Sequence, residues 1–481
     1  MYCVYRRDLR VDAVTPVLFY KYLANRPYSF LLESVVGGER VGRYSFVGMD
    51  PERVIRIVGR KVSVLDTTRR RPIFESLEDE GLQTLRKFHR QIFKNMRAQP
   101  DYPLSSGLVG YIGYDVARLL EKLPNGPGAG LDVPDTMLVF PRILVAFDHL
   151  LQRVSLFIHH RPGGRASAER TADGLVRRIR ATRASFELFE PGKNAPGESA
   201  VSSNVSEERF EAMVRKAQEY IRAGDIFQVV LSQRFETDFS GDSFWMYRAL
   251  RALNPSPYMF YLKYADFSLI GSSPEILVQL KGGKVYLRPI AGTRRRGATA
   301  VEDRALEREL LTDPKERAEH LMLVDLGRND VGAVAEFGTV QTTEAFTIER
   351  YSAVMHLVSQ VEGTLRPGKD AFDVFAAAFP AGTVTGAPKI RAMEIIDELE
   401  PTRRGPYAGA VGYFGAGSSM DLCITIRTIL ARANKAYVQA GAGIVHDSTP
   451  RHEFMETRNK ARALLRAVTL ARQMSGQKGS R

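Results

Sequence analysis

The stretch "LCITIRTILARANKAYVQAGAGIVHDSTPRHEFMETRNKARALL" (residues 422–465) contains both kinds of secondary structure from which we predict the fold. Its first half holds two runs rich in β-branched and apolar residues, 422–432 and 436–445, which predict strands. Its second half predicts a helix that begins near Thr449 and Pro450, because threonine caps helices and proline suits the first helical position. Four apolar side chains give this helix a core face: Ala461, Leu464, Leu465 and Val468.

Similar strand runs and helical patterns occur on the N-terminal side of this stretch. Further strands are predicted within residues 226–236, 267–280, 283–293 and 408–415. A helix is predicted to begin after Ser206, a good capping residue, and to stop at Gly224. Because strands and helices come in runs without a steady βαβ alternation, the predicted fold class is α+β.

A segment without apolar periodicity divides the chain. The stretch "FEPGKNAPGESAVSSNVS" (189–206) is rich in proline, glycine, serine and asparagine, which is typical of an exposed linker or long loop. Before it, residues 53–66 and 142–160 predict strands, and residues 107–123 predict a strand that turns into a helix. We therefore expect an N-terminal region at 1–188, a linker at 189–205, a second domain at 206–466 and a C-terminal tail at 467–481.

Composition limits the compartment and the class of protein. The chain has 481 residues, of which 44% are hydrophobic and 26% charged, as expected of a soluble globular protein with more than one core. Cys3 and Cys423 are too few for a disulfide framework, and we find no apolar run long enough for a membrane span and no secretory leader. These features predict a cytoplasmic protein that does not bind a membrane.

The net charge of +13 is compatible with either nucleic acid or an anionic substrate as a partner. Lysines and arginines are spread along the chain, and no nucleic-acid-binding signature accompanies them, so nucleic acid is not the expected partner. A basic nucleic-acid-binding protein without catalytic activity is kept as an alternative.

Two helix starts each carry a pair of glutamates. Glu316 and Glu319 lie three residues apart in "TDPKERAEHLMLVDLGRND" (312–330), and Glu453 and Glu456 repeat this spacing after residue 450. A spacing of three places both carboxylates of a pair on one side of a helix. Together the pairs would suit Mg²⁺, which prefers oxygen ligands; the alternative is two ordinary surface helices with acidic first turns.

Seven further segments, in this order, resemble the chorismate-utilising enzymes across nearly all of residues 206–466. They are "PIAGTRRRG" (289–297), "KERAEHLMLVDLGRND" (315–330), "VMHLVSQVEG" (354–363), "FPAGTVTGAPKIRAMEIIDELEP" (379–401), "RGPYAGAVGYFG" (404–415), "CITIRT" (423–428) and "GAGIVHDSTPRHEFMETRNKA" (441–461). Within that family, "LLESVVGGERVGRYSFVG" (31–48) and "NPSPYMFYL" (254–262) resemble the large subunit of anthranilate synthase. The resemblance implies a large sandwich of antiparallel β-sheets flanked by helices, with an N-terminal mixed α+β regulatory portion.

The resemblance also implies a lyase reaction, the first step of tryptophan biosynthesis, in which chorismate and ammonia give anthranilate and pyruvate. It places Mg²⁺ on Glu319 and Glu456, with Glu316 and Glu453 acting through water. Arg427 would bind the enolpyruvyl carboxylate, because a guanidinium can form two parallel hydrogen bonds to it. The other implied substrate contacts are Gly292, Thr293, Tyr407 and the backbone of Gly441, Ala442 and Gly443.

Two residues are candidates for proton transfer. His356 lies in an apolar strand-like context, where a histidine is often a hydrogen-bonded core residue, but by resemblance it is the family's active-site histidine. Glu275 matches the carboxylate that protonates the departing hydroxyl in related enzymes, a task that requires a raised pKa. Glu275 is the better candidate for the acid.

The resemblance implies ammonia as the nucleophile. Related water-using enzymes carry a lysine where this chain has Gln228, and aminodeoxychorismate synthases typically carry one where it has Ala291. Neither cysteine lies on the glycine-flanked turn that a glutaminase nucleophile needs, so a separate glutaminase subunit is expected to release ammonia from glutamine. Whether the assembly is a dimer of chains or a heterotetramer stays open, and aminodeoxychorismate synthase component I is the alternative function.

A feedback site for tryptophan is the last expectation from the resemblance. Ser34 could hydrogen-bond a polar group of the ligand, while Pro257, Tyr258 and Met259 offer a stiff turn, an aromatic face and an adaptable thioether to an indole. The alternative is that Ser34 lies at a strand end and that "NPSP" (254–257) is merely a turn.

Overall fold

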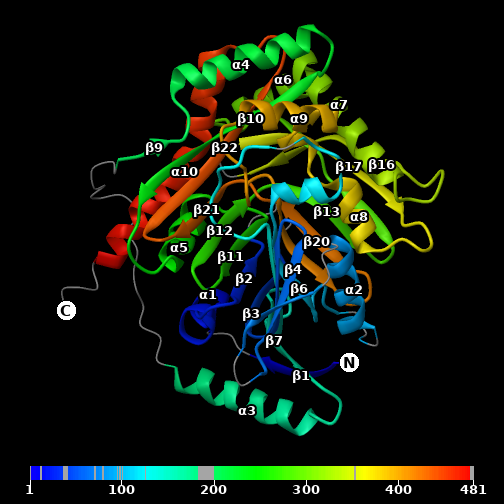
Figure 1. Ribbon diagram of the computed structural model, residues 1–481, viewed down its shortest axis with the longest axis vertical. Helices are drawn as coiled ribbons and strands as arrows, with labels where there is room; N and C mark the ends of the chain where they lie inside the picture. The colour runs from blue at the N-terminus through cyan, green and yellow to red at the C-terminus, as the bar shows by residue number, and fades with distance from the viewer. Residues whose placement is uncertain are drawn as a thin grey trace.

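A computed structural model of the chain describes residues 2–10, 14–35, 42–69, 72–77, 81–94, 96, 99, 101–124, 126–182, 200–351 and 354–476. Within these residues, all 22 strands join one sheet, and its strand pairings are antiparallel. Helices cover the outside of this sheet (Figure 1). The predicted α+β class is thereby confirmed.

The elements before residue 200 form a sheet-rich part with two longer helices and three short helical segments. The strands are β1 (Cys3–Arg10), β2 (Ser29–Glu33), β3 (Tyr44–Val58), β4 (Lys61–Asp66), β5 (Phe74–Ser76), β6 (Gly107–Ile112), β7 (Thr136–Asp148) and β8 (Arg153–His160). The helices are α1 (Pro16–Phe19), a π-helix (Tyr20–Ala24), α2 (Leu82–Phe93), a 3₁₀ helix (Tyr114–Leu119) and α3 (Arg165–Ala181).

The elements after residue 200 complete the sheet and most of its helical cover. The strands are β9 (Ser202–Ser203), β10 (Gln228–Asp238), β11 (Tyr258–Lys263), β12 (Phe267–Ser273), β13 (Ile276–Lys281), β14 (Lys284–Leu287), β15 (Ile290–Arg295), β16 (Gln341–Arg350), β17 (Val354–Thr364), β18 (Gly386–Ala387), β19 (Ala410–Gly415), β20 (Met420–Ile424), β21 (Thr428–Arg432) and β22 (Lys435–Ile444). The helices are α4 (Glu207–Arg222), α5 (Phe244–Leu253), α6 (Ala300–Thr312), α7 (Pro314–Gly332), α8 (Ala371–Ala378), a 3₁₀ helix (Gly382–Val384), α9 (Lys389–Leu399) and α10 (Pro450–Gly476).

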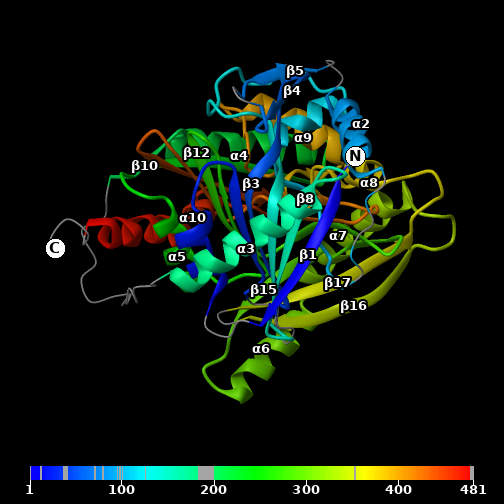
Figure 2. The same ribbon diagram turned by 90° about the horizontal axis from the view of Figure 1, so that it is seen from below.

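The sheet divides into two branches at the long β3–β7 pair. One branch runs from β3 through β2, β11, β12, β21 and β22 to β10. The other runs from β7 through β6, β19, β20, β13 and β14 to β17, which β15 and β16 also join. In Figure 2, β16 and β17 extend from the body on the side opposite α10. The two branches are the two sheets of the expected sandwich.

Apolar side chains from both branches fill the space between them. Phe260, Leu269 and Leu430 come from the first branch, and they share one buried cluster with Tyr111 and Tyr413 from the second. Burying such aromatic and aliphatic surface is the main favourable contribution to folding. The interior of the sandwich therefore joins strands that are far apart in the sequence.

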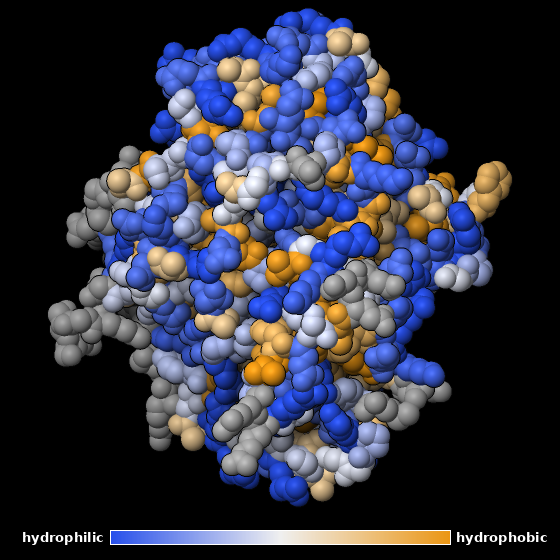
Figure 3. Space-filling model, in the orientation of Figure 1, coloured by the Kyte–Doolittle hydropathy of each residue, from blue (hydrophilic) through white to orange (hydrophobic). Residues whose placement is uncertain are grey.

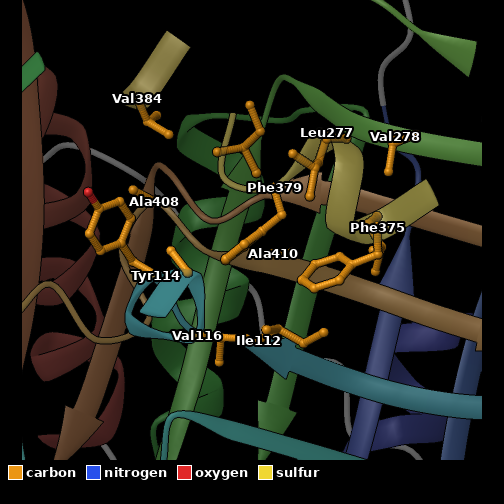
Figure 4. Packing of buried hydrophobic residues seen from close by; sticks show 14 of the residues in the cluster. Ile112, Tyr114, Val116, Leu277, Val278, Phe375, Phe379, Val384, Ala408 and Ala410 are labelled. Atoms are coloured by element: carbon orange, nitrogen blue, oxygen red, sulfur yellow. The ribbon is translucent and has the colours of Figure 1, made fainter. Parts of the chain in front are cut away.

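The helices bury their apolar stripes on the outer faces. The stripe predicted for the C-terminal helix is observed, with Leu464 and Val468 in one buried cluster with Ile429 and Val438. On the other branch, Phe375 packs near Ile112 (Figure 4). Outside these cores, the face seen in Figure 3 is mostly hydrophilic with scattered apolar residues, which is ordinary for a protein surface.

Several predicted elements are confirmed. Ser206 caps α4 by accepting a hydrogen bond from the Arg209 amide, and Gly224 follows the helix with a positive φ of 82°. The helical part of residues 107–123 is only a short 3₁₀ helix, and at its start the Tyr114 amide donates to the Gly405 carbonyl oxygen across the fold. No helix among the described residues is long and apolar enough to cross a membrane.

The expected domain limits do not separate independent sheets. Strands before residue 189 pair directly with strands after residue 206, as β2 does with β11 and β6 with β19. Most of the expected linker, residues 189–199, lies outside the described residues. The expected tail at 467–481 needs correction, because α10 continues to Gly476 and buries Ala467 and Ala471 through the same apolar stripe; residues 477–481 lie outside the described part.

Candidate active site

A cavity of about 590 Å³ gathers most of the predicted site residues. It lies where β10, β15 and β22 meet the starts of α7 and α10, which place acidic residues at its wall. The predicted residues that line it are Glu275, Gly292, Thr293, Glu316, Glu319, Tyr407, Arg427, Gly441, Gly443, Glu453 and Glu456. Segments that are far apart in the second domain thus form one site.

The starts of the two helices bring the glutamate pairs together. Asp313 caps α7, since its carboxylate accepts hydrogen bonds from the amides of Lys315 and Glu316 at 2.9 and 3.3 Å. Pro450 is the first residue of α10, as the sequence predicts, and Pro314 is the first residue of α7. Because both helices begin at the cavity, both acidic first turns face the same space.

The carboxylates of this site lack full compensation by cations. Burial, and then the nearby charge of Glu316, raise the pKa of Glu319. Burial also raises the pKa of Glu453, and the charge of Glu456 adds to this, although the hydrogen bond from the Ser448 hydroxyl lowers it. One carboxylate oxygen each from Glu453 and Glu456 and one ring nitrogen of His452 lie within 4.8 Å of one another, a group that does not include Glu316 or Glu319. Its two carboxylates are the kind of oxygen donor that a hard divalent cation prefers.

Two carboxylates of the cluster do have cationic partners. Glu316 accepts a hydrogen bond from Arg294 at 2.8 Å, and Glu456 lies 2.6 Å from the Lys460 ammonium, one helical turn further along α10. Because each of these two carboxylates already has a cationic partner, these contacts do not distinguish Glu316 from Glu456 as a metal ligand.

The cavity also offers cations and open backbone. Arg427 has a positive φ of 51° and donates a hydrogen bond to the Lys460 carbonyl oxygen at 2.8 Å. Lys460 in turn donates from its ammonium to the Gly441 carbonyl oxygen at 3.0 Å. A Cβ at Gly441 would lie 2.7 Å from the Tyr407 hydroxyl, so only glycine fits between this strand and the tyrosine.

Ala442 is the predicted substrate contact that does not line the cavity. It is fully buried on β22 between Gly441 and Gly443, both of which do line it. Side chains alternate across a strand, so the methyl group of Ala442 points into the core on the other face. The predicted contact was with the Ala442 backbone, so the direction of the methyl group does not contradict it.

His356 lies behind the cavity wall and not in it. It pairs with Thr293 across β15 and β17, and its Nδ1 lies 3.0 Å from the Thr293 hydroxyl and 3.3 Å from the Gly292 carbonyl oxygen. Burial lowers its pKa, which favours the neutral imidazole at neutral pH. A neutral histidine in contact with two cavity residues can accept or pass on a proton there.

Glu275 has the electrostatic property expected of an acid. It occupies the short connection between β12 and β13, where burial raises its pKa to about 7 against the opposing effects of the Thr383 hydroxyl and Lys460 ammonium. A carboxyl group with this pKa is partly protonated at neutral pH. It can therefore donate a proton to a group in the cavity.

Sequence reasoning missed other cavity residues. Lys460, Thr383 and Gln439 line it although their motifs were quoted only for their neighbours. Lys460 could have been found, because it stands four residues after Glu456 on a predicted helix and so shares its face. Gln439 gave no such signal.

A second cavity of about 830 Å³ holds all four residues predicted for tryptophan: Ser34, Pro257, Tyr258 and Met259. Its wall includes both branches of the sheet. The Tyr258 hydroxyl donates to Asp421 at 2.9 Å and accepts from the Gln279 amide at 3.0 Å. Burial raises the pKa of Asp421 to about 6. The cavity thus combines apolar walls with a few fixed polar groups, as small-molecule sites do.

Sequence comparisons place the chain among known enzymes. A family model described as "chorismate binding enzyme" matches residues 42–466. A curated relative from Cereibacter sphaeroides, "Anthranilate synthase component 1", is 48% identical over 475 residues, covering 97% of this chain and 94% of that relative. The protein of the same name from Thermus thermophilus is 45% identical over 474 residues, covering 97% and 98%. These names support the main interpretation and not the aminodeoxychorismate alternative.

Solved structures agree with the sandwich fold. Anthranilate synthase component I from Streptococcus pneumoniae TIGR4 has a TM-score of 0.79 at 35% identity, covering 95% of this chain and 98% of that one. The menaquinone-specific isochorismate synthase of Escherichia coli has a TM-score of 0.73 at 19% identity, covering 97% and 95%, which shows a shared fold alone.

Proposed function

Because the chain belongs to the chorismate binding enzyme family, we propose that it is component 1 of an anthranilate synthase. It is an enzyme that acts on chorismate, and with ammonia it forms anthranilate, pyruvate and water. The observation that carries the proposal is one cavity that combines the acidic first turns of α7 and α10 with Arg427 and with Glu275, whose pKa is about 7. That combination suits a dicarboxylate substrate that must lose a hydroxyl group.

Each residue has a role that follows from its chemistry. Arg427, with the neighbouring Tyr407 hydroxyl, holds the enolpyruvyl carboxylate. Glu275 donates a proton to the C4 hydroxyl as it leaves, and His356, acting next to Thr293, assists the later loss of pyruvate. Glu319 and Glu456 would hold Mg²⁺, with Glu316 and Glu453 contributing through water. When bound, this ion would neutralise the ring carboxylate of chorismate and polarise it.

The nucleophile in this proposal is ammonia. Gln228 and Ala291 both line the cavity, so the site lacks the lysine base of the water-using relatives at the first position and the lysine of the aminodeoxychorismate synthases at the second. Cys423 is buried, and burial raises the pKa of its thiol, which is the opposite of what a glutaminase nucleophile needs. Ammonia therefore comes from a separate glutaminase subunit, and both cysteines are free, as in a cytoplasmic protein.

The direct test is an assay of chorismate turnover with ammonium salt and Mg²⁺ at alkaline pH, followed by anthranilate fluorescence. Fluorescent product and stoichiometric pyruvate are expected from the chain alone, since free ammonia replaces the glutaminase. Formation of aminodeoxychorismate, or no consumption of chorismate, would contradict the proposal.

His356→Met is expected to separate the two chemical steps. Without the imidazole, ammonia should still add, but pyruvate loss should slow by about 100-fold or more, so an amino-deoxyisochorismate intermediate accumulates. Chromatography of quenched reactions measures the intermediate and anthranilate separately. Anthranilate formation at the parent rate would instead assign His356 a structural role.

Tryptophan is the proposed ligand of the second cavity and a feedback inhibitor. Ser34→Phe should fill part of this cavity without touching the acidic cluster, and we expect it to raise the tryptophan concentration for half-inhibition by about tenfold or more. Turnover measured against tryptophan concentration tests this in parent and variant. A parent enzyme that millimolar tryptophan leaves uninhibited would show that the cavity has another ligand.

A further inference from the structure

The two cavities share a wall. Pro274 and Ile290 line both of them, while between these shared positions Glu275 lines the catalytic cavity and Ile276 lines the second one. The backbone of residues 274–276 is therefore the partition between the two sites. Any displacement of this partition moves the proposed acid directly.

Two buried serines connect the second cavity to this partition. Ser256, which precedes Pro257, donates a hydrogen bond from its hydroxyl to the Ser273 carbonyl oxygen at 2.7 Å. The Ser273 hydroxyl donates to the Ile424 carbonyl oxygen at 2.6 Å. The Ile424 amide then donates to the carbonyl oxygen of Glu275 at 3.0 Å. These bonds form an unbroken path from the 254–257 turn to the acid.

The hydrogen bonds of this path are shielded from water. Ser256 and Ser273 are 4% and 0% exposed, so water cannot readily replace a lost hydroxyl contact. Leaving a buried carbonyl oxygen without its donor costs free energy, and the backbone is expected to shift to relieve it. The turn is also tied to β12 a second time, because the Asn254 amide donates to the Ser272 hydroxyl at 3.0 Å.

We propose that Ser273 is a positioning residue for Glu275, and that Ser256 links this position to the second cavity, so that a ligand seated against Pro257 changes turnover by moving the partition. The inference rests on the proposed function for the identity of the reaction and of the ligand. An allosteric ligand must contact two states of the protein differently. Here the two states would differ in the position of the 254–257 turn, which the ligand would touch and whose displacement the serines would transmit.

The first arm of the test concerns Ser273. Ser273→Ala is expected to lower kcat for anthranilate by about 10- to 100-fold, because small misplacements of a catalytic group have effects of this size, while the KM for chorismate changes by less than about threefold. Ser273→Cys keeps a weak donor and should recover part of the loss. Ser268→Ala is the matched control, since Ser268 is buried on the same strand, bonds to Ser243 and lies in neither cavity.

Parent values of kcat in both Ser273 variants would overturn the positioning role. An equal loss in Ser273→Ala and Ser268→Ala would do the same, because it would indicate general damage to β12. Circular dichroism and thermal unfolding of all three variants identify any that fail to fold, and in that case Ser273→Cys alone decides the question.

The second arm measures coupling. In Ser256→Ala, the dissociation constant of L-tryptophan measured by calorimetry is expected to stay within about threefold of the parent value. At saturation, however, tryptophan should inhibit the variant much less than the parent, with the rate of each protein compared with its own rate without ligand. Full inhibition of Ser256→Ala at saturating ligand would overturn the link. A parent enzyme that makes no anthranilate, or that binds no tryptophan, would contradict the proposed function in that respect. A parent that binds tryptophan and is inhibited, with Ser256→Ala behaving identically, would contradict only the link through Ser256.

Discussion

Glu456→Gln is expected to lower kcat for anthranilate formation by about 1,000-fold or more at saturating chorismate. The substitution removes one negative charge from the acidic cluster at nearly constant volume, and metal-assisted charge stabilisation is worth several kcal/mol, about 4 kcal/mol being needed for this factor. The same change in Glu319→Gln should have a similar effect. Turnover at limiting and saturating Mg²⁺ gives both the lost rate and the lost affinity.

Thermal unfolding supplies a second measurement that does not depend on activity. Mg²⁺ should raise the Tm of the parent, since it binds only the folded state, and this increase should be lost in Glu456→Gln. In the presence of a chelator the variant should be at least as stable as the parent, because the charge of Glu456 helps to raise the pKa values of Glu453 and Glu319.

Glu211→Gln is a matched control for this experiment. Glu211 pairs with Arg215 one turn away on α4, as Glu456 does with Lys460 on α10, and it lies outside the cavity. Such exposed pairs contribute little to stability, so the control should keep the parent rate and the Mg²⁺ effect on Tm. Near-parent turnover in both Glu456→Gln and Glu319→Gln would show that the metal site is elsewhere.

Local signals in the sequence were sufficient for the helices that build the active site. Thr449 and Pro450 predicted the start of α10, and the spacing of three in each glutamate pair predicted that its two carboxylates share one side of a helix. The resemblance supplied the partner residues on distant strands. The division of the sheet into two branches at β3 and β7 could not be predicted from local sequence, because it depends on which strands pair across the whole chain.

Features that depend on tertiary packing could not be predicted from the sequence. The partition at residues 274–276 arises only when β12 and β13 bring two cavities to one backbone segment. The pKa of Glu275 is likewise a property of its surroundings, since the unperturbed value for a glutamate is 4.5.

Glu275→Gln is expected to lower kcat by about 100- to 10,000-fold, the range typical of a lost general acid, because an amide of the same size cannot protonate the departing hydroxyl. In the parent, the acid is functional when protonated, so its contribution should decline as pH rises through about 7. The variant should lack this dependence. Rates must be compared at constant free ammonia, since the fraction of ammonium that is deprotonated also rises with pH.

Protein stability gives the same residue an independent test. The pKa of Glu275 is about 7 in the folded chain against 4.5 for an unperturbed glutamate, so the folded state holds this proton more tightly than the unfolded state. Its contribution to stability is therefore fully present below about pH 4.5 and is lost progressively as pH rises to about 7. Glu275→Gln removes this titration, so its stability relative to the parent should increase between about pH 5 and about pH 8 in urea unfolding. If the difference between the two proteins does not change with pH, Glu275 is ionised in the folded state at neutral pH, and another group must supply the proton for loss of the C4 hydroxyl.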